Sequence, residues 1–320
     1  MIRHDDKVIL RTGVEISRLS LGTAAIGGLY TSVSDDQCTD TLLTALEQGI
    51  NFIDTAPHYG KGTSERRIGR AFAGKPRSSF VISTKIGRLL VPSTTDIDDF
   101  FMDADNTVER KFDFSASGVR QSLEGSLERL GLDSVEIVLI HDPDANAEEA
   151  ILESYPELER MRSEGIIKAI GVGMNQCETP TRMIKEIDID MVLIAGRYSL
   201  LDQRAEHELL PAALERNVDI IAAGVFNSGI LAKPVKGATY DYVPASDKLL
   251  AKALKIREVL EAHQVSLTSA ALQFPLRHPA VKSVLVGCRS ATEVLTNIAE
   301  FNTPIDDKAW DDLVSVLELA

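Results

Sequence analysis

The stretch that decides the fold runs from Asn51 to Phe72 and reads NFIDTAPHYGKGTSERRIGRAF. It begins as a short apolar run and ends as an amphipathic helix, which is the pattern of one strand–helix unit. The loop between them carries an acid, an imidazole and a phenol, at Asp54, His58 and Tyr59. Three titratable groups placed directly after a strand suggest a site.

The same alternation of strand and helix recurs along the chain. Apolar or β-branched runs occupy 17–22, 51–55, 80–86, 135–141, 167–173, 190–195, 218–224 and 282–287. Stretches with helical periodicity lie between them at 34–49, 115–131, 148–165, 179–187, 202–217 and 246–264. This order predicts a (β/α)8 TIM barrel. An open doubly wound sheet is less favoured, because LGTAAIGG after the first strand lacks the G-x-G-x-x-G spacing of a dinucleotide loop.

The chain reads as one domain over residues 1–320, because we find no short repeat and no linker that would divide it. One connection departs from the pattern. Residues 87–114 read GRLLVPSTTDIDDFFMDADNTVERKFDF, a polar, acidic stretch that is too long for a plain strand-to-helix connection. We expect a mobile flap over the site, with a disordered segment as the alternative.

Composition narrows the classes of partner. The chain has 48 acidic and 34 basic residues, a net charge of −14, which argues against nucleic acid as a partner. No run approaches the roughly 18 apolar residues of a membrane span. The amino terminus lacks the pattern of a secretory signal, so we expect a cytoplasmic location. Cysteines and histidines show no metal-ligand spacing, so no metal is expected. The oligomeric state is left open.

Four ionisable residues should meet at one rim of the barrel. In such barrels the active site forms at the carboxyl ends of the strands. Asp54 ends the second strand, Tyr59 follows it, Lys85 lies near the end of the third, and His141 closes the fourth. Each residue alone fits an ordinary role as a cap, a solvated end or a hydrogen-bonded histidine. Together they indicate catalysis.

Their chemistry can be argued from the residue types. Lys85 lies inside an apolar strand, where an ammonium group needs an anionic partner, and Asp54 on the neighbouring strand can provide it. A cation beside a phenol favours the phenolate, which brings the pKa of Tyr59 down from about 10 toward a range useful for acid–base catalysis. His141 can hold the reacting oxygen by a hydrogen bond.

At this point the sequence resembles the aldo-keto reductase family over essentially the whole chain. The segments FIDTAPHYGKGTSERRIG, STKIG, LIHDPD, AIGVG and GCRSATEVLTNI match its landmarks in order. The resemblance implies hydride transfer between a nicotinamide cofactor and a carbonyl–alcohol pair. It also implies that Asp54, Tyr59, Lys85 and His141 form the catalytic set, with Tyr59 handling the proton.

The resemblance further implies that a dinucleotide lies across the barrel rim. The positions that match its binding residues are Thr23, Asn175, Gly224, Phe226, Asn227, Gly229, Leu231, Gly287, Arg289, Glu293 and Asn297. The chain departs from the family where the nicotinamide is usually held, since it reads Met174-Asn175, Gly196-Arg197 and Ala223-Gly224 there. Asn175 and Phe226 are therefore the candidates for holding the nicotinamide.

Glu293 bears on the choice of cofactor. By the resemblance, it stands where mammalian members of the family carry an arginine to the 2′-phosphate of NADP. A carboxylate there repels the phosphate and can accept a hydrogen bond from a ribose hydroxyl, which favours NAD. Arg289 nearby could still serve a phosphate, so NADP is not excluded.

We expect the substrate to be a small molecule. GVGMNQ, AGVFNSGIL, HDPD and the long flap resemble the branch that contains aldose 1-dehydrogenases, L-fucose dehydrogenases and pyridoxal 4-dehydrogenases, which oxidise cyclic hemiacetals to lactones. Tyr30 and His58 could contact either substrate. We place the sugar first because carboxylates crowd the flap, at Asp96, Asp98, Asp99, Asp103 and Asp105, whereas a pyridine would stack on Phe100 or Phe101.

Two hypotheses place the protein in other functional classes. Some members of this family, the potassium-channel β subunits, act chiefly as cofactor-binding regulatory modules, and an intact catalytic set does not exclude that role. A metal-dependent hydrolase or a Schiff-base aldolase is less favoured, because the histidines are scattered and the position of Lys85 beside Asp54 and Tyr59 favours an ion pair.

Overall fold

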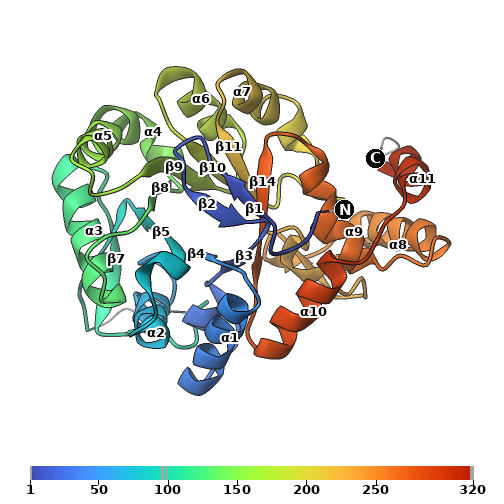
Figure 1. Ribbon diagram of the computed structural model, residues 1–320, viewed down its shortest axis with the longest axis horizontal. Coiled ribbons are helices and arrows are strands. Elements are labelled where there is room, and N and C mark those ends of the chain that lie inside the picture. Colours follow the sequence, from blue (N-terminus) through green and yellow to red (C-terminus); the bar gives the residue numbers. More distant parts are fainter. Residues whose placement is uncertain (1, 95–96, 99, 318–320) are drawn as a thin grey trace.

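The computed structural model describes residues 2–94, 97–98 and 100–317. Within these ranges, eight parallel strands close into a barrel in the order β3-β4-β5-β8-β9-β10-β11-β14 (Figure 1). They are β3 (Leu19–Gly22), β4 (Phe52–Asp54), β5 (Val81–Ile86), β8 (Ile137–His141), β9 (Ala169–Met174), β10 (Met191–Ala195), β11 (Asp219–Ala223) and β14 (Val281–Gly287). The expected TIM barrel is confirmed, and each strand coincides closely with its predicted range.

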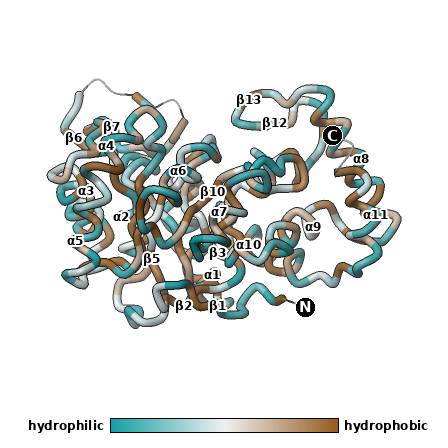
Figure 2. Tube along the Cα trace, turned by 90° about the horizontal axis from the view of Figure 1, so that it is seen from above, coloured by the Kyte–Doolittle hydropathy of each residue, from teal (hydrophilic) through white to brown (hydrophobic). Residues whose placement is uncertain are grey.

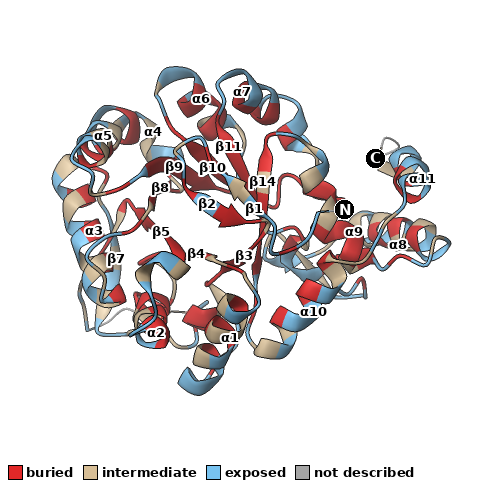
Figure 3. Ribbon diagram, viewed as in Figure 1, coloured by how far each residue is buried: buried red, intermediate tan, exposed pale blue. Residues whose placement is uncertain are grey.

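Helices surround the barrel and bury their inner faces, as the alternating colours of Figure 3 show. They are α1 (Asp35–Glu47), α2 (Thr63–Phe72), α3 (Ala116–Leu130), α4 (Ala147–Glu149), α5 (Tyr155–Ser163), α6 (Glu178–Glu186), α7 (Leu209–Glu215), α8 (Asp247–Glu261), α9 (Leu267–Gln273), α10 (Ala291–Phe301) and α11 (Asp307–Leu317). Serine side chains cap several amino termini, at Ser34, Ser115, Ser246, Ser266 and Ser290. Each accepts a hydrogen bond from a backbone N–H that the helix cannot use.

One predicted helix is wrong over part of its length. Within the predicted range 202–217, the α-helix covers only Leu209–Glu215. The Asp202 carboxylate accepts a hydrogen bond from the backbone N–H of Arg204 at 3.1 Å, and the Gln203 side chain donates to the Ser199 carbonyl. Local bonds of this kind compete with helix formation, so the segment begins as a turn.

The barrel interior and the layer outside it form separate apolar clusters. The interior is filled by large side chains from alternate strand positions, including Phe52, Leu139, Met191 and Leu285. The outer layer packs the helices on the strands. Burying each such side chain contributes about 1.5–3 kcal/mol, so the strand ends are held firmly in place.

A hairpin closes the amino-terminal end of the barrel. It consists of β1 (Lys7–Ile9) and β2 (Glu15–Ser17), which pair antiparallel. Leu10, Val14 and Ile16 join the cluster inside the barrel. Figure 2 shows this hairpin at the end of the molecule opposite to β6, β7, β12 and β13. The hairpin therefore leaves the carboxyl ends of the strands as the open end of the barrel.

Hairpins also stand at the carboxyl end. They are β6 (Arg88–Pro92) with β7 (Val108–Phe112), and β12 (Thr239–Tyr240) with β13 (Val243–Pro244). The first pair lies in the predicted flap, so the alternative of a disordered 87–114 segment is wrong for its described residues. Asp103 anchors the segment to Arg67 at 2.9 Å. Asp96 and Asp99, counted among the flap carboxylates, lie outside the described residues.

Candidate active site

The four predicted catalytic residues come together at the carboxyl ends of β4, β5 and β8. Lys85 Nζ donates to Asp54 Oδ2 at 2.7 Å and to the Tyr59 hydroxyl oxygen at 3.0 Å. Ser83, paired with Asp54 across the two strands, donates to Asp54 Oδ1 at 2.7 Å. The ring of His141 meets that of Tyr59 edge-on, with centroids 6.0 Å apart. The result is one polar cluster in which Asp54, Lys85 and His141 are buried and Tyr59 is partly buried.

A cavity of about 370 Å³ opens onto this cluster. Tyr59, Lys85 and His141 form part of its wall, and Asp54 lies beneath. The wall also contains each residue predicted to contact the substrate, namely Tyr30, His58, Phe100 and Phe101. Phe101 is buried and stacks on Tyr59 at 6.2 Å, whereas Phe100 is 59% exposed.

The charge state of Tyr59 differs from the sequence-based argument. Burial raises the pKa of Tyr59 to about 12, because desolvation of the phenolate outweighs the opposing effect of Lys85. The expected fall of this pKa toward neutrality is therefore wrong for the protein alone. Burial tends to lower the pKa of Lys85, but Asp54 and Tyr59 raise it further, so the net shift is upward. At neutral pH the ammonium is charged and the phenol holds its proton.

Both histidines at the cavity are neutral. Burial lowers the pKa of His141 well below its ordinary value, and the positive charges of Lys85 and Arg88 add to this. Burial, followed by Arg88 and Arg110, lowers the pKa of His58 to about 2. A neutral imidazole has one N–H donor and one acceptor nitrogen. His141 can thus donate a hydrogen bond to a neutral or negative oxygen.

Sequence reasoning missed the charged part of the cavity wall. Arg88 donates to Asp142 Oδ2 at 2.8 Å and contacts His58 Nδ1 at 3.1 Å. Arg110 forms an ion pair with Asp98 at 2.5 Å and donates to the His58 carbonyl at 2.8 Å. Arg88 and Arg110 come from β6 and β7, whose pairing places them close together. Polar and apolar residues do not alternate in these short strands, RLLVP and VERKF, so their pairing had no clear signal in the sequence.

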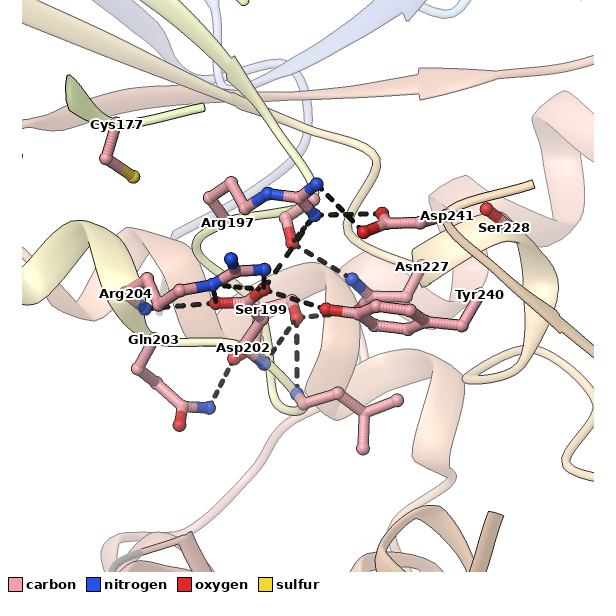
Figure 4. A network of polar contacts seen from close by, with 12 residues as sticks. Cys177, Arg197, Ser199, Asp202, Gln203, Arg204, Asn227, Ser228, Tyr240 and Asp241 are labelled. Atoms are coloured by element: carbon pink, nitrogen blue, oxygen red, sulfur yellow. Dashed lines mark hydrogen bonds and ion pairs between the residues drawn. The ribbon is translucent and has the colours of Figure 1, made fainter. Parts of the chain in front are cut away.

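Tyr242 is a further wall residue that the sequence did not reveal. It follows Asp241 in the hairpin of β12 and β13, and both residues have positive φ. Arg197, just after β10, donates to both carboxylate oxygens of Asp241 at 2.8 Å (Figure 4). Tyr240 donates to Asp202 Oδ2 at 2.8 Å. The hairpin is thereby anchored, and Tyr242 is held at the cavity.

Some of the predicted cofactor-binding residues lie at the cavity or its rim, and others are buried. Asn175 lines the cavity and Gly224 is exposed at the rim. Gly224 has φ +61°, and a Cβ there would lie 3.0 Å from the Gly196 nitrogen, so glycine is required. Thr23, Asn227 and Leu231 are instead buried. Phe226 is partly buried against the outer apolar cluster, and Gly229 is exposed.

The buried members of this set hold the rim together. Thr23 donates to the Asp54 carbonyl at 2.8 Å, directly behind the catalytic cluster. Asn227 donates to the Gly196 carbonyl at 3.1 Å and accepts from Ser199 at 2.6 Å, which joins the loops after β10 and β11 (Figure 4). These residues position loops of the site.

The segment after β14 forms a turn and a helix start. Gly287 is exposed, and Ser290 caps α10. Glu293 accepts a hydrogen bond from the backbone N–H of Arg289 at 2.8 Å, while the Arg289 guanidinium lies 3.8 Å from the same carboxylate. Asn297 is buried and donates to Cys288 Sγ. Arg289 and Glu293 are therefore adjacent, half-exposed and of opposite charge.

Within the described ranges, no cluster of three or more His, Cys, Asp or Glu side chains has an arrangement suited to a metal ion. In the same part of the chain, none of the helices combines the length and apolar character that a membrane span requires.

Comparison with known proteins assigns the family. The profile of the Aldo/keto reductase family matches residues 18–318. The chain is 40% identical to a D-threo-aldose 1-dehydrogenase from Pseudomonas sp over 310 residues, 94% of each chain. It is 36% identical to a pyridoxal 4-dehydrogenase from Microbacterium luteolum over 333 residues, 97% of each chain. The protein therefore belongs to the aldo-keto reductase family of oxidoreductases, whose members use nicotinamide cofactors.

A solved structure agrees on the fold. The aldo-keto reductase from Bacillus halodurans in its holo form superposes with a TM-score of 0.79 at 23% identity, covering 99% of this chain and 96% of that one. At this level of identity the likeness supports the barrel alone.

Proposed function

We propose that the protein oxidises the cyclic hemiacetal form of an aldose, such as L-fucose, at its anomeric carbon and yields the lactone, with NAD as the hydride acceptor. The observation that carries this proposal is the Tyr59 hydroxyl group, hydrogen-bonded to Lys85 beside neutral His141, at a cavity lined by charged hydrogen-bonding side chains. The likeness to an aldose 1-dehydrogenase supports the choice of substrate class.

Each side chain has a defined part in the proposed reaction. His141 donates a hydrogen bond to the anomeric oxygen and orients it. Tyr59 in its phenolate form, which the charge of Lys85 stabilises, takes the proton of that hydroxyl group and becomes a neutral phenol. Asp54 holds Lys85 in place and neutralises its charge, with Asp54 Oδ2 2.7 Å from Lys85 Nζ. A bound nicotinamide would supply the hydride acceptor for the anomeric carbon.

Several groups at the rim suit the binding of a dinucleotide. Asn175 offers an accessible amide at the cavity, suited to the nicotinamide carboxamide. Gly224 lets the backbone approach closely. The capped amino terminus of α10 and exposed Gly287 suit phosphate oxygens or the adenosine ribose. We assign NAD, because Glu293 at this helix start would repel a 2′-phosphate.

A substrate panel tests the proposal. The purified protein is incubated with NAD and L-fucose, D-arabinose, L-galactose or pyridoxal, and NADH absorbance is followed. We expect turnover of at least one sugar with the lactone as product. Failure of all four, together with reduction of an open-chain aldehyde, would contradict hemiacetal oxidation. Tight NAD binding without any turnover would favour the cofactor-binding regulatory module.

Pyridoxal oxidation is the second candidate, because Phe100 is exposed at the cavity and could stack on a pyridine ring. The likeness to a pyridoxal 4-dehydrogenase supports it. If pyridoxal alone is oxidised and Phe100→Ala or Phe101→Ala removes that activity, this candidate replaces the sugar.

A further inference from the structure

Asp142 occupies an unusual place beside the proposed reaction centre. It directly follows His141, and its Oδ2 lies 3.5 Å from His141 Nε2. Its φ is +43°, a left-handed conformation that residues other than glycine seldom adopt, although aspartate and asparagine tolerate it better than most. Its backbone N–H donates to the Gly173 carbonyl at 3.0 Å, which helps to hold this turn. The surroundings therefore maintain the carboxylate at the cavity wall.

Arg88 fixes the direction of this carboxylate. It donates from Nη2 to Asp142 Oδ2 at 2.8 Å, and its side chain is only 15% exposed. Its other terminal nitrogen faces His58 Nδ1 at 3.1 Å. Because a guanidinium can only donate, His58 Nδ1 must accept and the ring proton lies on Nε2. Arg88 thus orients two groups at the same wall of the cavity, the Asp142 carboxylate as an acceptor and the His58 Nε2–H as a donor.

The carboxylate keeps acceptor capacity for a ligand. An ionised carboxylate can accept about four hydrogen bonds. Arg88 uses Oδ2, and 31% of the Asp142 side chain remains accessible. Burial raises the pKa of Asp142, and Arg88 opposes that rise. A hydroxyl group entering the cavity would therefore find a directed acceptor.

The distance to His141 indicates which hydroxyl group this would be. The two oxygens of a vicinal diol lie roughly one hydrogen-bond length apart. If His141 holds the anomeric oxygen, the hydroxyl oxygen on the next carbon falls within reach of Asp142, since the two protein groups are 3.5 Å apart.

We propose that Asp142, oriented by Arg88, binds the hydroxyl group on carbon 2 of the substrate and thereby selects aldoses over hemiacetals that lack a vicinal hydroxyl group. This inference rests on the proposed oxidation of aldoses. A pyridoxal hemiacetal has an aromatic carbon without a hydroxyl group at that position. Such a ligand would cover the open part of the half-buried carboxylate without offering it a hydrogen-bond donor, which disfavours its binding.

The test compares D-arabinose with 2-deoxy-D-ribose, which differs from D-arabinose only by lacking the hydroxyl group on carbon 2. kcat/KM for both sugars is measured on the wild type and on Asp142→Asn, which retains the size of the side chain and tolerates positive φ. We expect the wild type to prefer D-arabinose by about 10- to 100-fold, as for a hydrogen bond to a charged group. The variant should lower this ratio to a few-fold, mainly by losing activity on D-arabinose.

Asp144→Asn serves as the matched control. Asp144 is exposed two residues further along and is not part of the cavity wall, so the same change of charge should leave the ratio unchanged. Arg88→Lys is the second variant, because lysine retains the charge but cannot orient Asp142 and His58 together. We expect an intermediate ratio for it.

The outcomes separate this inference from the proposed function. If the wild type oxidises D-arabinose and Asp142→Asn retains its ratio, aldose oxidation stands and the role of Asp142 is overturned. A wild-type ratio near one overturns it as well. If no aldose is oxidised, both proposals fail. If Asp142→Asn does not fold by circular dichroism, an unchanged ratio in Arg88→Lys overturns the inference and a lowered one supports it.

Discussion

Replacing Lys85 by methionine separates an electrostatic role from a structural one. Burial raises the pKa of Tyr59 to about 12, and Lys85 opposes that rise. Without the ammonium the pKa of Tyr59 goes higher still, so the phenolate forms only at higher pH. We expect Lys85→Met to slow oxidation by at least about 100-fold and to shift its pH–rate profile upward. Ser83→Ala, which removes one bond to Asp54, is the control. An unchanged profile would mean that the ion pair only supports the fold.

Glu293 offers the second test at the level of single residues. We expect the wild type to bind NADH more tightly than NADPH, as measured by fluorescence titration. Glu293→Gln retains an oxygen acceptor for the Arg289 N–H and removes only the charge, so it should relax the preference. Glu293→Arg should add affinity for NADPH, about tenfold or more. Tight NADPH binding by the wild type would reverse the assignment and indicate Arg289 as the phosphate ligand.

The anchored hairpin of β12 and β13 makes a prediction at the level of an element. Arg197 and Asp241 hold it by paired hydrogen bonds at 2.8 Å, which places Tyr242 at the cavity. Arg197→Met should release the hairpin, raise KM for the sugar several-fold and increase proteolysis between residues 239 and 244. Arg182→Met is the control, because it removes an exposed arginine that pairs with Glu148 and Glu186. It should change neither KM for the sugar nor the rate of proteolysis. Equal behaviour of the two variants would show that the hairpin does not depend on Arg197.

The elements differ in how well the sequence predicts them. Barrel strands such as 80–86 are predictable because their apolar runs alternate with long amphipathic stretches. The hairpins are short, and their pairing is set by contacts distant in the chain, such as Asp103 with Arg67. Polar and aromatic residues at 87–114 give no clear period, so that segment resembles a loop. The start of the 202–217 range fails for a local reason, since Asp202 binds its own backbone.

At the level of the whole molecule, the site is predictable where it lies at strand ends and not where loops complete it. Asp54, Lys85 and His141 follow from the barrel rule, because parallel strands bring their carboxyl ends to one rim. Arg88, Asp142 and Tyr242 reach the cavity through hairpins and a left-handed turn, which composition does not reveal. The pKa of Tyr59 depends on burial, and burial is a property of the complete fold.

Deuterium transfer from carbon 1 of L-fucose tests the proposed chemistry most directly. L-fucose labelled with deuterium at carbon 1 is incubated with NAD, and the NADH and lactone are examined by mass spectrometry. We predict that each NADH formed carries one deuterium, that the lactone carries none, and that Tyr59→Phe binds NADH normally but transfers no label. NADH formed without deuterium, or label transfer by Tyr59→Phe at a rate comparable to the wild type, would contradict hydride transfer with Tyr59 as the proton acceptor.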